Sequence, residues 1–119
     1  MNFNLEYIKA LASHHEGVDV EFKETTGQLN RGMETLCGMI NGKGGIVIFG
    51  ITNKGNIVGQ EVGDKTTREI GEALRKFDPA LDIEPIYIPI DESGKHLIVF
   101  KSDGQESDKP VGWQTIPTS

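Results

Sequence analysis

The stretch Asn41–Gly59, NGKGGIVIFGITNKGNIVG, constrains the fold more than any other part of the chain. Its centre, Ile46–Gly50, carries no charged or polar side chain, which predicts a strand buried on both faces. Glycines at positions 42, 44 and 45 precede this strand, and we expect a close turn there that a Cβ would obstruct. Residues 52–55, TNKG, have the composition of a tight turn, so the chain is predicted to return beside the central strand over Ile57–Val58.

The rest of the chain divides into helices and strands around this stretch. Periodic apolar residues predict helices over residues 4–12, 29–40 and 66–77, the last beginning with a capping box from Thr66 to Glu69. Strict alternation predicts a half-buried strand over residues 18–23. Two further strands are predicted over residues 86–90 and 95–101, the first at an edge because of Pro89. The order α-β-α-β-β-α-β-β predicts an α+β domain, with a mixed, largely antiparallel sheet covered by helices.

The length of 119 residues fits one domain with one core, which we place over residues 1–101. Residues 102–119 are mostly polar, and only Val111, Trp113 and Ile116 are suited to docking on that core. We therefore expect residues 102–119 to form a polar tail that leads to further modules.

The composition narrows the class of protein. Hydrophobic residues make up 36% and charged residues 25%, as in soluble globular domains. No apolar run approaches the roughly 20 residues of a membrane span, so no membrane contact is expected. Cys37 is the single cysteine, which rules out an internal disulfide and suits a reducing, cytoplasmic compartment. Because the net charge is −6, contact with a nucleic acid requires a local basic patch.

The glycines do not form a nucleotide-binding loop. A Walker loop lies between a strand and a helix and carries a hydroxyl residue after its lysine. Here Gly42, Lys43 and Gly44 follow a predicted helix and precede a strand, and the glycine spacing also differs. We expect no cofactor, and we interpret the glycines as a tight connection between helix and strand.

Acidic residues gather near the start of the chain's first predicted strand. Glu16 precedes it, Glu21 lies within it and Glu24 follows, and two carboxylates near one strand end could offer oxygen ligands to a divalent cation, although two are too few to assign a metal site. His14 and His15 beside Glu16 invite a zinc interpretation, but no second His or Cys cluster completes a tetrahedral site. We assign no metal, and keep Glu16 and Glu21 as the alternative metal-binding and catalytic residues.

Basic residues form the second candidate site. Lys23, Lys43 and Lys54 lie at predicted strand ends or turns, and Arg31 lies on the outward side of the second helix. The backbone N–H groups of Gly44 and Gly45 would add contacts to phosphates. The alternative is that these lysines are ordinary solvated turn residues.

These motifs together resemble the Schlafen/AlbA-like family of DNA-binding domains. That family shows a glutamate, four residues and then E-F-K-E, followed by an N-T-x-G-G corner, a strand ending in G-V-D-D-x-G, and I-V-G. The matching positions are Glu16, Glu21, Phe22, Lys23, Glu24, Asn41, Gly44, Gly45, Gly50, Gly55, Val58 and Gly59. The resemblance covers residues 4–101 and implies an α+β fold found at the N-terminus of bacterial transcriptional regulators.

The resemblance also implies an alternative activity, because some eukaryotic relatives are ribonucleases with a three-carboxylate site. Glu16 and Glu21 match the first two acids, whereas Thr52 and Asn53 replace both aspartates of the G-V-D-D element. Asp64 could reach in from the next loop. We therefore expect a non-catalytic module that binds nucleic acid, most simply DNA, through Lys23, Arg31, Lys43, Gly44, Gly45 and Lys54. A metal-dependent nuclease and a protein-interaction or homodimerisation module remain the alternatives.

Overall fold

The computed structural model describes residues 4–13, 19–104 and 110–113. Its elements, in chain order, are α1 (Leu5–Ser13), β1 (Val20–Lys23), the short 3₁₀ helix η1 (Thr26–Gln28), α2 (Leu29–Ile40), β2 (Gly44–Phe49), β3 (Gln60–Glu61), α3 (Asp64–Leu74), β4 (Phe77–Asp78), β5 (Ile86–Pro89), β6 (Lys95–Asp103) and β7 (Gly112–Trp113). The protein is an α+β domain, as predicted, and α2 has the predicted bounds.

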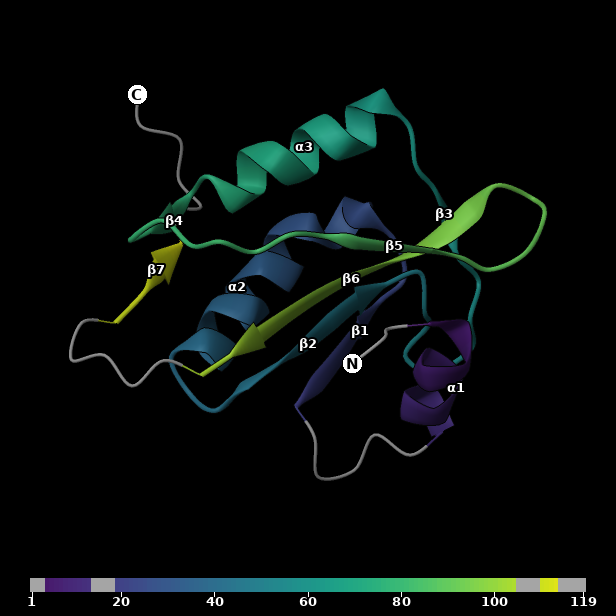
Figure 1. Cartoon of the computed structure of the whole chain (residues 1–119), viewed down its shortest axis with the longest axis horizontal. Coiled ribbons are helices and arrows are strands. Elements are labelled where there is room, and N and C mark those ends of the chain that lie inside the picture. The colour runs from purple at the N-terminus through teal and green to yellow at the C-terminus, as the bar shows by residue number, and fades with distance from the viewer. Residues whose placement is uncertain (1–3, 14–18, 105–109, 114–119) are drawn as a thin grey trace.

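The main sheet has five strands, with β2 and β6 at its centre (Figure 1). β6 pairs antiparallel with β2, β3 and β5, whereas β1 pairs parallel with β2. The parallel pair follows from the connection, because α2 carries the chain from the end of β1 back to the start of β2. The sheet is therefore mixed and mostly antiparallel, in agreement with the prediction.

Helices cover both faces of the sheet (Figure 1). On one face, α2 and α3 pack on Val47 and Phe49 of β2, together with Ile98 and Phe100 of β6. On the other face, α1 packs on residues that alternate with these, including Ile48. Consecutive residues of β2 thus point into different cores, which confirms that this strand is buried on both sides.

The predicted return over Ile57–Val58 is reduced to a single antiparallel bridge and does not form a regular strand beside β2. β2 ends at Phe49, and Gly50 takes a φ of +107°, which breaks the extended conformation. Only one isolated bridge, between Ile51 and Ile57, joins the two arms of the turn. The return strand is β3 at Gln60–Glu61, and it pairs with β6 instead of β2. Backbone bonds from Val58 and Gly59 to the carbonyl of Gly50, at 2.9 and 2.8 Å, close the intervening loop.

Several boundaries also differ from the predicted ones. The predicted helix over residues 66–77 ends at Leu74, because Phe77 and Asp78 form β4. α3 begins at Asp64, where the Thr66 hydroxyl accepts a hydrogen bond of 3.2 Å from the backbone N–H of Gly63. Thr66 therefore caps the helix from inside its first turn, and the predicted box from Thr66 to Glu69 is not the cap. β6 continues to Asp103. Within the predicted tail, Val111 and Trp113 pack against the core, and Gly112–Trp113 form β7 beside β4.

Candidate functional site

The glycine corner before β2 is a packed structural junction. Gly44 is buried with a φ of +89°, and a Cβ there would overlap the carbonyl of Ser102 and lie 2.7 Å from the backbone nitrogen of Gly104. A Cβ on Gly45 would lie 2.8 Å from the carbonyl oxygen of Asp19. Both glycines also belong to the ladder with β6. Close packing explains both glycines, and a role for their N–H groups in phosphate binding stays a prediction.

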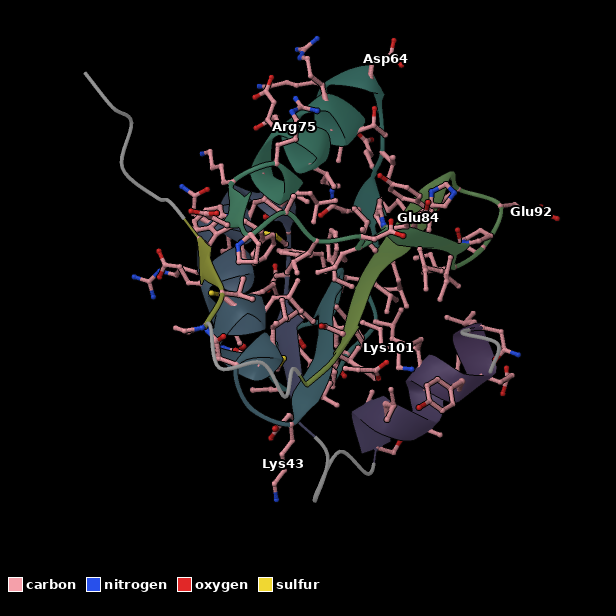
Figure 2. The ribbon with its side chains drawn as sticks, turned by 60° about the vertical axis from the view of Figure 1, so that its left-hand side comes forward. Lys43, Asp64, Arg75, Glu84, Glu92 and Lys101 are labelled. Carbon is pink, nitrogen blue, oxygen red and sulfur yellow. The ribbon has the colours of Figure 1, made fainter. Side chains whose placement is uncertain are left out.

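Lys43 is an exposed residue of this corner. It lies in the turn between α2 and β2, and its side chain projects away from the body of the protein (Figure 2). None of the described residues forms an ion pair with it. Its charge is therefore available to an external anion.

The three other candidate cations lie at the opposite end of the β1–β2 pair. Lys23 is the last residue of β1 and pairs in register with Phe49, the last residue of β2. Arg31 lies in the first turn of α2, beside Gly32, where an added Cβ would meet the ring of Phe49. Lys54 lies in the turn that follows β2. The structure thus brings Lys23, Arg31 and Lys54 to one end of the β1–β2 pair.

The candidate set is divided between two places, because β2 separates Lys43 from the other three cations. This strand has six residues. At about 3.3 Å per residue, six residues span roughly 20 Å. One phosphate group cannot contact both ends, so the predicted residues do not form a single compact patch.

Lys23 differs from the other cations because it has an internal partner. Its Nζ lies 3.4 Å from Oε1 of Glu21, and its side chain is only 14% exposed. The aliphatic part of the lysine packs at the sheet edge while its charge is balanced by the neighbouring carboxylate. Arg31 and Lys54 are exposed and have no ion pair within residues 4–13, 19–104 and 110–113. These two are the available cations at this end.

A buried glutamine joins η1 to β3 at the same end of the protein. Gln60 is 8% exposed. Its Oε1 accepts a hydrogen bond of 2.8 Å from the backbone N–H of Thr26, and its Nε2 donates to the Thr26 hydroxyl and to the carbonyl of Glu61, both at 3.2 Å. The side chain therefore holds η1, and with it the start of α2, against β3.

This clamp brings further charged residues to the end that carries Arg31. α3 begins only a few residues after Gln60, so Lys65 and Arg68 in its first turns lie at this end, together with the acidic Glu61 and Asp64. Lys65 and Arg68 are not among the predicted site residues. The Gln60–Thr26 contact near the start of α3 joins residues 34 positions apart, and such a contact leaves no local pattern in the sequence.

We expect the Gln60→Ala variant to lose about 1–3 kcal/mol of unfolding free energy, because the partly buried N–H of Thr26 loses its acceptor and the three hydrogen bonds of the Gln60 side chain are removed. Urea unfolding followed by circular dichroism measures this loss. The matched control is Gln28→Ala, since Gln28 is exposed and its side chain makes no capping bond to α2. Equal stability of the two variants would show that the clamp is not structural.

The acidic candidates are only partly within the described residues. Glu16, His14 and His15 lie outside them. Glu21 contacts Lys23, as given above, and Glu24 is exposed. The Thr52 hydroxyl accepts a hydrogen bond of 3.1 Å from the backbone N–H of Asn56, and Asn53 is exposed in the same turn. Among the described residues, no three His, Cys, Asp or Glu side chains converge as metal ligands.

Asn41, a residue of the family motif that we did not assign to a site, has a structural role. Its Oδ1 accepts a hydrogen bond of 2.7 Å from the N–H of Val111, and its Nδ2 donates one of 2.8 Å to the Val111 carbonyl. The side-chain amide thus binds both backbone groups of one residue, as a neighbouring strand would. The partner is 70 residues away, so the sequence alone does not reveal this contact.

Comparison with known proteins agrees with this architecture. The family model described as "Schlafen, AlbA_2" matches residues 16–114. No curated protein matches the sequence. In the described part of the chain, no helix has the length and hydrophobicity needed to span a membrane.

Two solved structures share the fold. The solution structure of the N-terminal domain of a RecG-related protein from Nitrosomonas europaea aligns over 100% of this chain and 92% of its own, with a TM-score of 0.59 and 22% identity. A crystal structure of a protein from Corynebacterium diphtheriae has a TM-score of 0.54 and 20% identity. That alignment covers 91% of this chain but 22% of the other, so this chain spans about a fifth of its length. The family match extends over most of the sequence, and the chain belongs to the Schlafen AlbA_2 family.

Proposed function

We propose that this domain is a non-catalytic nucleic-acid-binding module of a transcriptional regulator, with DNA as its ligand. Its membership of the Schlafen AlbA_2 family is the observation that carries the proposal. A structural relative at the N-terminus of a protein named for its relation to the DNA helicase RecG is consistent with a role on DNA.

The contact is proposed to centre on the end of the sheet that carries Arg31 and Lys54. Both side chains are exposed and have no internal counter-ion among the described residues, so neither must break an ion pair to meet a phosphate. Lys23, although paired with Glu21, lies at the same end of the β1–β2 pair and adds to the local field. Lys43 and the glycine corner provide a second, separate contact at the other end of β2.

The charges predict weak binding dominated by phosphate contacts. The overall charge of −6 repels a polyanion, and acidic residues lie close to the proposed surface. We expect a dissociation constant on the order of 10⁻⁴–10⁻⁶ M at physiological salt, rising steeply as salt increases. Fluorescence anisotropy with a labelled DNA duplex at several salt concentrations tests this directly. Absence of binding by the wild-type protein at low salt would favour a protein-interaction module.

The nuclease alternative is weakened by the surroundings of Glu21. Carboxylate-based phosphodiester cleavage requires a divalent cation that stabilises the charge on the phosphate and generates hydroxide. The ammonium group of Lys23 already lies 3.4 Å from the Glu21 carboxylate, where a cation would have to bind. The turn that carries the family's aspartates holds the neutral Thr52 and Asn53 instead.

We therefore expect no cleavage of single- or double-stranded RNA or DNA in the presence of Mg²⁺ or Mn²⁺. Incubation of the purified protein with labelled substrates, beside a Glu21→Ala variant, is the assay. The Asn53→Asp variant restores one of the missing charges and should bind Mn²⁺ more tightly than wild type. Metal-dependent cleavage by the wild type that disappears in Glu21→Ala would replace the binding-module proposal with the nuclease.

A further inference from the structure

The segment of residues 110–113, which we call the strap, joins the C-terminal parts of α2 and α3. It contains β7, which pairs with β4 in a two-stranded sheet separate from the main one (Figure 1). The strap therefore shares no ladder with the five strands that form the centre of the fold. What holds it in place is a small set of contacts to the two helices and to β4.

On the α2 side, the strap is held through Val111. The Asn41 side chain binds its N–H and its carbonyl at 2.7 and 2.8 Å, and the Cys37 thiol donates to the same carbonyl at 3.2 Å. The valine side chain is 4% exposed and belongs to the core between the sheet and the two helices. One asparagine thus supplies most of the polar attachment at this point.

On the α3 side, the strap is held through Trp113. Its indole Nε1 donates a hydrogen bond of 2.8 Å to the carbonyl of Ala73, in the last turn of α3. The Nζ of Lys76 lies 5.3 Å from the ring centroid, within the range of a cation–π contact. The ladder to β4 adds the pairs Phe77–Trp113 and Asp78–Gly112.

We infer that the strap is a latch, which releases from α2 and α3 in a step separate from the unfolding of the five-stranded sheet. Segments with few buried contacts and short ladders open at a lower free energy than the core they cover. Release leaves the main ladders intact, because none of them includes a residue of the strap. Release of the strap uncovers Cys37 and the apolar surface beneath Val111. A groove then opens between the C-terminal ends of α2 and α3.

The chain carries a probe on each side of this contact, since Cys37 and Trp113 are its only cysteine and tryptophan. The Cys37 thiol is partly buried and donates a hydrogen bond to the Val111 carbonyl, and burial raises its pKa, so it reacts more slowly with thiol reagents in the latched state. Release breaks this hydrogen bond and exposes more of the sulfur. The rate of thiol labelling therefore rises with the open population, and Trp113 fluorescence reports the docking of the strap.

We expect Asn41→Ala to raise the Cys37 labelling rate about tenfold in native buffer, because it removes two hydrogen bonds of the latched state. Its Trp113 emission should shift to longer wavelength while its far-ultraviolet circular dichroism stays that of the wild type. The control is Asn30→Ala, an exposed asparagine on the same helix, which should label at the wild-type rate. Asn41→Asp keeps the acceptor for the Val111 N–H but loses the donor, and should also label faster than wild type.

The wild-type protein provides a test that does not depend on any variant. In urea below the main transition, Cys37 labelling should accelerate with a shallower urea dependence than global unfolding, because releasing the strap exposes little surface. The inference is overturned if labelling follows the global unfolding curve in wild type, or if Asn41→Ala labels at the wild-type rate.

Discussion

The Gly45→Val variant is expected to be less stable than the wild type by about 2–3 kcal/mol, at the upper end of ordinary single substitutions. An added Cβ would lie 2.8 Å from the carbonyl oxygen of Asp19 and 2.9 Å from Cγ of Met39. The Asp19 carbonyl accepts the first bond between β1 and β2, from Ile46 at 2.9 Å. The extra side chain would therefore push these two strands apart and displace the end of α2.

Urea unfolding followed by circular dichroism measures this change. The matched control is Gly63→Val, because Gly63 has an extended backbone and no atom within 4 Å of its Cβ position. Gly63 is the N-cap residue of α3, where valine is less favourable than glycine, so we expect the control to lose no more than about 1 kcal/mol. An unchanged unfolding midpoint for Gly45→Val would mean that the glycine corner is not a close-packed junction.

The Arg31→Glu, Lys54→Glu double variant is expected to bind DNA at least about tenfold more weakly than wild type, whatever the DNA sequence. Each substitution replaces a phosphate contact with a repulsive charge. Because two contacts are lost, the slope of log affinity against log salt should become shallower by about 2.

A second double variant separates a local contact from the general effect of net charge. Lys9→Glu with Lys101→Glu makes the same change in net charge on α1 and β6, where both lysines already pair with neighbouring acids. Lys43→Glu alone tests the glycine corner. Equal weakening by the two double variants would place the effect in the overall field instead of the proposed surface.

The central part of the fold could be predicted from the sequence because its signals are local. The apolar spacing over residues 29–40 gave the bounds of α2, and the uncharged run at Ile46–Gly50 identified the strand that both cores share. The position of the return strand could not be predicted this way. Val58 and Gln60 are both compatible with a strand, and the partner is decided by the ladder with β6.

The candidate site was predictable only in part, for a related reason. The sequence identifies the exposed cations and places Lys43 and Lys54 on either side of one strand. It does not reveal that Lys23 is balanced by Glu21, or that Gln60 brings the start of α3 to the end that carries Arg31. Side-chain amides that bind a distant backbone, such as those of Asn41 and Gln60, carry no periodic signal.

The most direct test of the proposed function is a residue-resolved titration. We would add a short DNA duplex to isotope-labelled protein at low salt and follow its backbone amide resonances. We expect the largest amide shifts in residues 23–31 and 50–56, and smaller shifts around Lys43. Added salt should reverse the shifts in both groups. No shifts at low salt, or shifts confined to surfaces away from these residues, would contradict it.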